Sequence, residues 1–342
     1  PGHLKQSLAL VDLMGRLPFQ IKSTIIDVKF KNALQRGAFQ ICGFFFSNKC
    51  QGCMCCLRIL LGPEKSSKLL ANSYDAVVSC GSSLAMTNRL IASENMAKSI
   101  VIMKPGMFSL KRFDLAIIPE HDRAPKFKNV VSIKGALSRQ VDKDSPDIKA
   151  IIDSYGLDNP PLSKPTIGVL LGGESKYLSL RTEIVENLIA SLDKAIGELG
   201  ASVLISTSRR TAKQVDDFIK SKLSKRSGYR MSVIANESNP KGSVEAILHL
   251  SDILIVSGDS ISMISEAVNS KKHTLIIKLK RKNKNFISKH ERFVDNLAKD
   301  GYVLLCQNNL SEKISEIWSQ KPAVKQPVEQ ELIVDKLKVM LK

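Results

Sequence analysis

The chain has 342 residues, of which 43% are hydrophobic and 25% are charged. This balance is typical of a globular protein, and the length suits two domains better than one compact core. No run reaches the roughly 20 uninterrupted apolar residues that a membrane-spanning helix needs, so the sequence argues against an integral membrane protein.

Basic residues dominate the charge. Lys and Arg outnumber Asp and Glu by 51 to 33, which gives a formal net charge of +18. Such an excess suits nucleic acid, an anionic membrane face or a polyanionic substrate such as a nucleotide sugar. Apart from one dense run, Lys278–Arg292 ("KLKRKNKNFISKHER"), the lysines are scattered. A solvated basic surface is therefore favoured over a dedicated patch.

The sequence begins at Pro1 with no initiator methionine and no signal-peptide pattern, so we expect that its start has been trimmed. Its seven cysteines fit a reducing cytoplasm better than a disulfide scaffold. We expect a cytoplasmic protein, and peripheral attachment to a membrane stays open.

In the first half, apolar segments predict strands of a Rossmann-like α/β domain, residues 1–155. They are residues 74–81, 98–106, 113–122 and 129–135. The polar, proline-bearing stretch 153–165 shows neither strand nor helix periodicity, and we expect the domain boundary there.

The second half alternates apolar strands with amphipathic helices, which predicts a parallel sheet covered on both faces in a second domain, residues 156–320. The predicted strands are residues 166–173, 201–207, 231–236, 252–258, 273–279 and 302–306. Predicted helices are residues 180–199, with Gly200 as the C-terminal cap, 211–224, 243–250, a segment after Ser260, and 293–299. A last helix, residues 332–341 within 321–342, is a candidate to pack back on the first domain.

Three loops follow strands of the second domain, where doubly wound sheets bind ligands and backbone amides meet anions. We identify their glycines, hydroxyls and arginines as candidate donor-binding residues. These are Gly172, Gly173, Ser175, Ser208, Arg209, Arg210, Thr211, Gly258, Asp259, Ser260, Ser262 and Met263. Each loop alone is weak evidence, because glycine pairs in turns and arginine pairs on surfaces are common.

Glu266 lies on the helix that follows the third loop. With Ser262 it shares the face opposite the apolar stripe of that helix. Two interpretations stay open: a partner of the helix dipole, or an acceptor for paired hydroxyls such as those of a ribose.

The strings "GDSISMISEA", "LLGGES", "STSRRT", "FDLAIIPEHDR" and "PGHLKQSLAL" resemble the mitochondrial-fission family, of the elongated-mitochondria type, of proposed glycosyltransferases. The resemblance implies a GT-B architecture: two Rossmann-like domains that face a cleft, nucleotide sugar on the second, acceptor on the first, and no required metal or other cofactor. The ending "SISMISEA" also resembles the donor loop of the peptidoglycan N-acetylglucosaminyltransferase, whose glutamate holds the ribose, and by that resemblance Glu266 is the ribose residue. His3 of "PGH" matches the proposed general base, and His121 of "PEHDR" is a second catalytic candidate, although a lone histidine is more often structural.

Members of that family carry an apolar strand before "PGH", and this sequence begins without it. Either the start was trimmed or the first domain lacks a core strand.

The cysteine group Cys50–Cys56 ("CQGCMCC") invites a metal interpretation. Its cysteines are crowded and no second cluster follows, so buried reduced thiols are favoured. With "GFFF" nearby, the segment could also touch a membrane.

Two functions follow. The first is a metal-independent glycosyltransferase that moves a sugar from a nucleotide-diphosphate donor to a hydroxyl acceptor, lipid-linked or glycan. The alternative is a non-catalytic, membrane-associated adaptor that retains the fold. A nucleic-acid binder ranks third, because no aromatic-basic RNA motif accompanies the charge.

Overall fold

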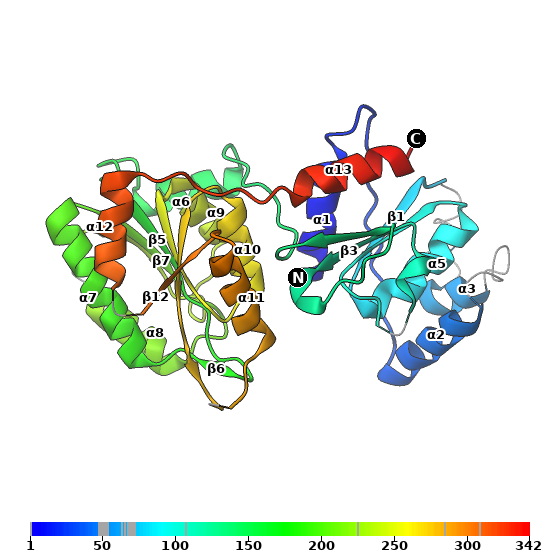
Figure 1. Ribbon diagram of the computed structural model, residues 1–342, viewed down its shortest axis with the longest axis horizontal. Coiled ribbons are helices and arrows are strands. Elements are labelled where there is room, and N and C mark those ends of the chain that lie inside the picture. The colour runs from blue at the N-terminus through cyan, green and yellow to red at the C-terminus, as the bar shows by residue number, and fades with distance from the viewer. Residues whose placement is uncertain are drawn as a thin grey trace. The chain divides into compact units, whose positions relative to one another are not determined.

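The computed structural model describes residues 2–46, 55–62, 64, 66, 73–106, 108–223, 226–283, 285–307 and 309–342. The chain forms two compact units (Figure 1). Unit 1 comprises Pro1–Arg139 and Val328–Lys342, and unit 2 comprises Gln140–Pro327.

This division differs from the boundary expected from the sequence. Helix α6 (Pro146–Tyr155) belongs to unit 2, because Ile148 and Ile151 are buried in the core of that unit. The last helix, α13 (Glu329–Met340), is the one that the sequence offered as a candidate to pack back on the first domain, and it belongs to unit 1, where it contacts α1 and β4 and buries Ile333 and Leu337. Each helix joins the core that covers its apolar face.

Unit 1 is built on a parallel four-stranded sheet in the order β1-β2-β3-β4. The strands are β1 (Ala76–Cys80), β2 (Lys98–Ile102), β3 (Leu115–Pro119) and β4 (Val130–Ile133). Helices α1 (Gly2–Met14) and α13 cover one face, and α5 (Ala85–Glu94) covers the other, with α2 (Ala33–Phe46) and α3 (Cys55–Leu61) packed on α5. Three short 3-10 turns complete the unit: η1 (Ser82–Leu84), η2 (Leu110–Arg112) and η3 (Glu120–Asp122).

Unit 2 holds a parallel six-stranded sheet in the order β12-β10-β9-β5-β7-β8. The strands are β5 (Thr166–Leu170), β7 (Ser202–Ser206), β8 (Tyr229–Val233), β9 (Ile253–Ser257), β10 (His273–Ile277) and β12 (Leu304–Cys306). A separate antiparallel pair joins β6 (Leu178–Ser179) to β11 (Lys280–Arg281).

Helices cover both faces of this sheet (Figure 1). One face packs against α7 (Thr182–Leu199), α8 (Lys213–Leu223) and α12 (Leu310–Gln320). The other packs against α6, α9 (Ser243–Leu250), α10 (Ile261–Asn269) and α11 (Lys289–Lys299). The α/β class and the parallel sheets predicted from the sequence are confirmed, and Gly200 ends α7 with a positive φ of 67°. No helix within the described ranges is long and apolar enough to cross a bilayer.

Candidate functional site

In the sheet of unit 2, the side on which successive strands are added changes between β5 and β9. From β5 the chain adds β7 and β8 on one side, and then β9, β10 and β12 on the other. Ligands of doubly wound sheets bind beyond the carboxyl ends of the strands at such a point. The predicted residues Gly172 and Gly173 follow β5. Gly258, Asp259 and Ser260 follow β9, so the two groups of residues lie on the two sides of this switch point.

Asp259 joins these loops. Its Oδ2 accepts hydrogen bonds from the Gly173 N–H at 3.0 Å and from Arg210 Nη2 at 3.1 Å, and its Oδ1 accepts one from Ser257 Oγ at 2.7 Å. The Asp259 side chain is 0% exposed, whereas that of Arg210 is 49% exposed. A carboxylate without access to water needs such partners, so Asp259 organises the site rather than meeting a ligand.

The glycine pair makes room for this arrangement. A Cβ on Gly172 would lie 2.1 Å from the Asp259 carboxylate oxygens, and one on Gly173 would lie 2.0 Å from the carbonyl oxygen of Arg210. We predicted from the sequence that these glycines admit a ligand. In the structure the missing side chains at both positions instead let Asp259 and the backbone of Arg210, from the neighbouring loops, approach closely.

The loop after β7 uses its hydroxyls internally. Thr211 Oγ1 donates to the Gly172 carbonyl at 2.5 Å and accepts from the Ser208 N–H at 2.9 Å, and Ser208 Oγ accepts from the Arg210 N–H at 3.2 Å. Arg209 is exposed. Arg209 and the exposed half of Arg210 therefore remain as the charged donors that this loop presents to solvent.

Several hydroxyls around α10 serve the fold. Ser260 is the N-cap and accepts a hydrogen bond from the Met263 N–H at 3.5 Å. Ser265 Oγ donates to the Ile261 carbonyl at 2.7 Å. With Ser257, which holds Asp259, three of the serines in this segment have structural roles.

The outward face of α10 stays accessible. Ser262 is exposed, and Met263 and Glu266 are half-buried. Ser262 and Glu266 are four residues apart, so they lie one above the other, about 6 Å along the helix axis. The face therefore pairs a hydroxyl at the positive end of the helix with a carboxylate one turn further on.

Ser175 lies apart from these contacts. Its Oγ accepts hydrogen bonds from the N–H groups of Tyr177 and Leu178, at 3.3 and 2.9 Å, within the turn that leads to β6. Helix α7 begins at Thr182, so the Ser175 hydroxyl belongs to this turn and not to the start of a helix.

His290 belongs to the site and was missed in the sequence. It is the second residue of α11, and its Nδ1 is buried without a hydrogen-bond partner among the described residues. Burial, reinforced by the charge of Lys289 and opposed by Asp259, lowers the pKa of His290, so the imidazole is neutral at pH 7. Its place in the first turn of the helix that follows β10 could have identified it, because that turn lies at the ligand-binding edge.

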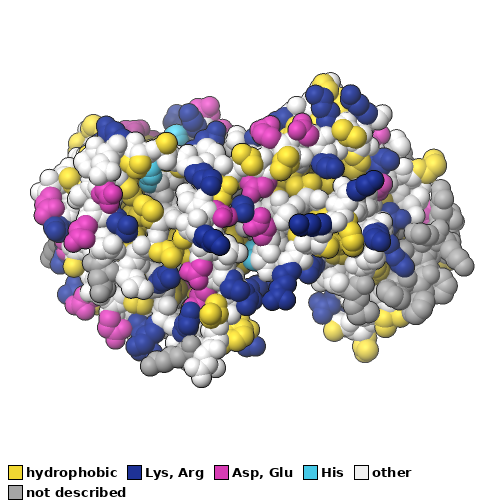
Figure 2. Space-filling model, in the orientation of Figure 1, with side chains coloured by type: hydrophobic (Ala, Val, Ile, Leu, Met, Phe, Trp, Pro, Cys, Tyr) yellow, Lys and Arg dark blue, Asp and Glu magenta, His cyan; other side chains and the backbone are white. Residues whose placement is uncertain are grey.

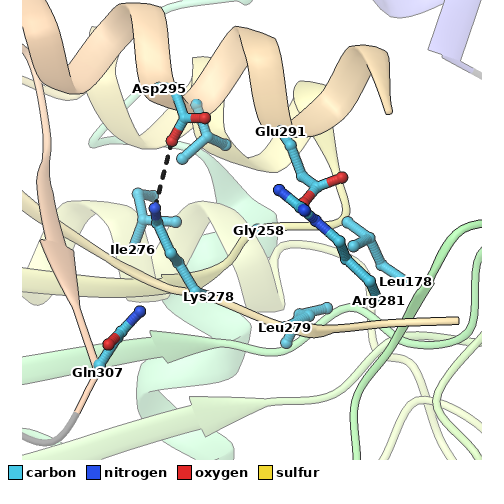
Figure 3. A pocket seen from close by; sticks show the side chains of 10 residues that line it. Leu178, Gly258, Ile276, Lys278, Leu279, Arg281, Glu291, Asp295 and Gln307 are labelled. Carbon is cyan, nitrogen blue, oxygen red and sulfur yellow. Dashed lines mark hydrogen bonds and ion pairs between the residues drawn. The ribbon is translucent and has the colours of Figure 1, made fainter. Parts of the chain in front are cut away.

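A cavity of about 270 Å³ opens beside these loops (Figure 3). Two ion pairs line it: Lys278 with Asp295 at 3.3 Å and Arg281 with Glu291 at 2.5 Å. The uncharged lining residues are Leu178, Gly258, Ile276, Leu279, Val294 and Gln307. Gly258 is the one predicted residue in this set. In the run predicted as a solvated surface, Lys278 and Arg281 are exposed, and with Glu291 they also line this cavity.

The two predicted catalytic histidines lie in unit 1. His3 is exposed on α1, and its ring packs where a Cβ of Gly81 would stand, with Cε1 2.8 Å from that point. His121 follows β3, its side chain is 4% exposed, and its Nε2 lies 4.0 Å from Asp122 Oδ1. Both occupy the carboxyl edge of the sheet, at β1 and β3, with β2 between them. Of the two, His3 is the accessible one.

The cysteine group lies almost entirely outside the described residues, and within it the side chain of Cys55 is described and is exposed. Among the described residues, no three His, Cys, Asp or Glu side chains gather closely enough to hold a metal.

The profile of the family described as "Mitochondrial fission ELM1" matches residues 1–329. The chain belongs to the mitochondrial fission ELM1 family. A relative within this family is the mitochondrial fission protein ELM1 of Arabidopsis thaliana, which is 26% identical over 226 residues, or 59% of this chain and 51% of that protein. The match thus spans about half the length of the plant ELM1 protein.

Solved structures resemble this ELM1-family chain over nearly its whole length. A UDP-GlcNAc 2-epimerase from Methanocaldococcus jannaschii has a TM-score of 0.59 at 13% identity and covers 99% of this chain and 97% of its own. A proposed UDP-N-acetylglucosamine 2-epimerase from Listeria monocytogenes has a TM-score of 0.53 at 11% identity, with 97% of this chain and 88% of its own covered. The fold is therefore of the GT-B class, and at these identities the likeness shows the fold alone.

Proposed function

We propose that this ELM1-family protein binds a nucleotide-diphosphate sugar at the carboxyl edge of the unit 2 sheet and transfers the sugar to a hydroxyl acceptor. The observation that carries the proposal is the outward face of α10 beside the loops that Asp259 holds in place. That face offers Ser262 and Glu266, and the neighbouring loop offers Arg209 and Arg210. The two solved structures with the same fold are named as enzymes of a nucleotide sugar, which supports this ligand class.

The residues divide the chemistry between them. Amides at the start of α10 and the guanidinium groups of Arg209 and Arg210 stabilise the charge that grows on the departing diphosphate. Glu266 accepts hydrogen bonds from the ribose hydroxyls. His3 takes the proton from the acceptor hydroxyl as the new carbon–oxygen bond forms and the bond to the diphosphate breaks. No metal is required in this scheme, because helix amides and arginines supply the positive charge.

Isothermal titration with UDP and UDP-GlcNAc tests the donor site. We expect saturable binding that weakens at least about tenfold in Glu266→Ala, since a carboxylate that bonds two hydroxyls contributes at least ~1.4 kcal/mol. Glu186→Ala, which removes an exposed carboxylate from α7, is the matched control and should bind as the wild type does. Equal affinity in Glu266→Ala and Glu186→Ala would remove Glu266 from the site.

A second candidate, a membrane-associated adaptor, is favoured by the surface around the β6–β11 pair. Phe286 and the adjacent Ile287 are 45% and 48% exposed, and Phe286 stacks on Tyr177 with ring centroids 4.8 Å apart. Lys176 and Lys280 are exposed beside them. In Figure 2, basic and hydrophobic side chains lie together near the end of unit 2 that carries β6 in Figure 1. Exposed apolar side chains among cations suit an anionic lipid surface.

Vesicle flotation tests this surface. We expect binding to vesicles that contain phosphatidylserine, no binding to phosphatidylcholine alone, and loss of binding at high salt. Lys176→Glu combined with Lys280→Glu should abolish flotation. Lys213→Glu combined with Lys222→Glu changes the net charge equally on α8 and should not. Equal loss in both pairs would mean that net charge acts alone, without a docking surface.

A further inference from the structure

The cavity of about 270 Å³ in unit 2 adjoins the start of α10 (Figure 3). Gly258 lines the cavity and stands two residues before Ser260, the N-cap of that helix. Two residues span at most about 7 Å, so the cavity and the first amides of α10 are neighbours. In a nucleotide sugar, the sugar is bonded directly to the diphosphate. A donor whose diphosphate lies at the start of α10 therefore has its sugar within reach of the cavity.

The size of the cavity suits a single sugar ring. Its volume equals the liquid volume of roughly nine water molecules, at ~30 Å³ each. Pockets for whole drug-sized molecules begin at about 300 Å³, so a nucleoside does not fit beside the sugar. The C–H face of a pyranose ring can pack against the apolar lining, which consists of Leu178, Ile276, Leu279 and Val294.

The polar lining is arranged as two ion pairs. Figure 3 shows Lys278 and Arg281, from the segment at the end of β10, reaching towards Asp295 and Glu291 on α11. Glu291 is fixed in place, because its Oε1 accepts from Arg281 and its Oε2 accepts from the N–H and Oγ of Ser288, at 2.9 and 3.0 Å. The pair Arg281–Glu291 therefore serves as a wall of the cavity.

The other pair is open to a ligand. Lys278 Nζ lies 3.3 Å from Asp295 Oδ1, and the two side chains are 42% and 50% exposed. An ammonium group donates and a carboxylate accepts, and a sugar hydroxyl can do both, so the pair can bind hydroxyls without being broken. Gln307 adds an exposed amide, which also donates and accepts.

The charges of the lining are balanced. Each of the two cations faces a carboxylate, so a ligand carboxylate in the cavity would meet Asp295 and Glu291 without a cation to itself. To pair with such a ligand, Lys278 would have to leave Asp295 beside a second negative charge. Like charges placed together in this way oppose binding.

We propose that the sugar of the donor occupies this cavity and is a neutral hexose rather than a uronic acid, with Lys278 and Asp295 bound to its hydroxyls. The inference rests on the proposed donor site at α10 and adds the class of sugar to it. Asp295 acts here as a specificity residue: it accepts a hydrogen bond from a neutral sugar and repels an acidic one.

Isothermal titration with UDP, UDP-glucose and UDP-glucuronate tests the proposal. The wild type should bind UDP-glucose at least about tenfold more tightly than UDP, and UDP-glucuronate no more tightly than UDP. Asp295→Asn keeps the size of the side chain and removes its charge. It should leave the affinity for UDP unchanged and strengthen the binding of UDP-glucuronate at least about tenfold. Asp217→Asn, which changes an exposed carboxylate on α8, is the matched control and should bind all three as the wild type does.

The outcomes separate this proposal from the donor site itself. If UDP binds and Glu266→Ala weakens it, but Asp295→Asn discriminates between the two sugars as the wild type does, the donor site stands and the proposed sugar class is overturned. Tighter binding of UDP-glucuronate than of UDP-glucose by the wild type overturns it as well. Failure of UDP itself to bind removes the donor site and this proposal with it.

A variant that fills the cavity gives a second, independent measurement. Leu279→Trp adds bulk at a half-buried position of the lining. Its affinity for UDP should match that of the wild type, which also shows that the variant is folded, and its affinity for UDP-glucose should fall to that for UDP. If Leu279→Trp binds UDP as well as the wild type does and still prefers UDP-glucose by the same factor, the sugar lies outside the cavity and the proposal fails.

Discussion

A Cβ atom on Gly172 would lie 2.1 Å from both carboxylate oxygens of Asp259. Real Cβ atoms do not approach oxygen so closely, so the residue at 172 and the buried carboxylate at 259 depend on each other. The contact joins the loops on the two sides of the switch point, and Thr211 closes the cluster through its bond to the Gly172 carbonyl. The geometry of the candidate donor site therefore requires glycine, which has no Cβ, at position 172.

Gly172→Ala should destabilise the protein. The added methyl group must displace Asp259 from its bonds with Gly173, Ser257 and Arg210, and overpacking of this kind costs about 1–3 kcal/mol. Urea unfolding measures the loss. Gly197→Ala is the control, since nothing lies within 4 Å of its Cβ position on α7, and it should stabilise the helix by up to about 1 kcal/mol. Equal stability of the two variants would contradict the predicted clash.

Stability should fall as the pH drops below about 6.5. Burial lowers the pKa of His249, His273 and His290, so the unfolded chain binds their protons more readily than the folded chain does. The free energy of unfolding therefore rises with pH from the folded pKa values up to about 6.5 and is constant above it. Urea unfolding across this range measures the slope.

The carboxylates act in a separate window. The pKa values of Glu174 and Glu291 are lowered from 4.5, so the stability that they add is lost only at more acidic pH.

Replacement of the three histidines by glutamine should flatten the slope between about pH 5 and 6.5. A slope that survives in the triple variant would assign it to other groups.

Cys80 and Cys306 should resist alkylation in the folded protein. Burial raises the pKa of Cys80 to about 12 and that of Cys306 to about 11, so little thiolate is present at pH 8. Cys55 is exposed and should react with iodoacetamide roughly 100-fold faster or more. Mass spectrometry of labelled peptides measures the rates, and in urea the three thiols should react alike. Labelling of Cys80 as fast as Cys55 without denaturant would show that the buried strand opens readily.

His3→Ala should lower sugar transfer by ~100-fold or more and leave donor affinity nearly unchanged. The base acts on the acceptor, and the proposed donor residues all belong to unit 2. A single-turnover assay beside a titration separates the two effects. A protein that transfers sugar equally well without His3 must take its base from elsewhere, and His121 is the next candidate. An adaptor would show no transfer in either form.

The sequence by itself determined the α/β class and most elements. The apolar runs that became β5, β7, β9 and β10 are buried on both faces, and such continuous runs are legible without coordinates. Helix α7 was equally plain, because its leucines repeat at helical spacing and Gly200 follows them. These patterns depend on residues that are close in the chain, so the sequence alone is enough to recognise them.

Only the tertiary structure decided what the loop residues do. Gly172, Asp259 and Arg210 are far apart in the chain, and their hydrogen bonds exist because parallel strands bring their carboxyl ends to one edge. The place of α6 in unit 2 was likewise invisible, since its apolar face fits either core by composition. His290 entered the site for the same reason: neither burial nor the field of Asp259 and Arg210 is encoded by neighbouring residues, and both arise when distant segments pack.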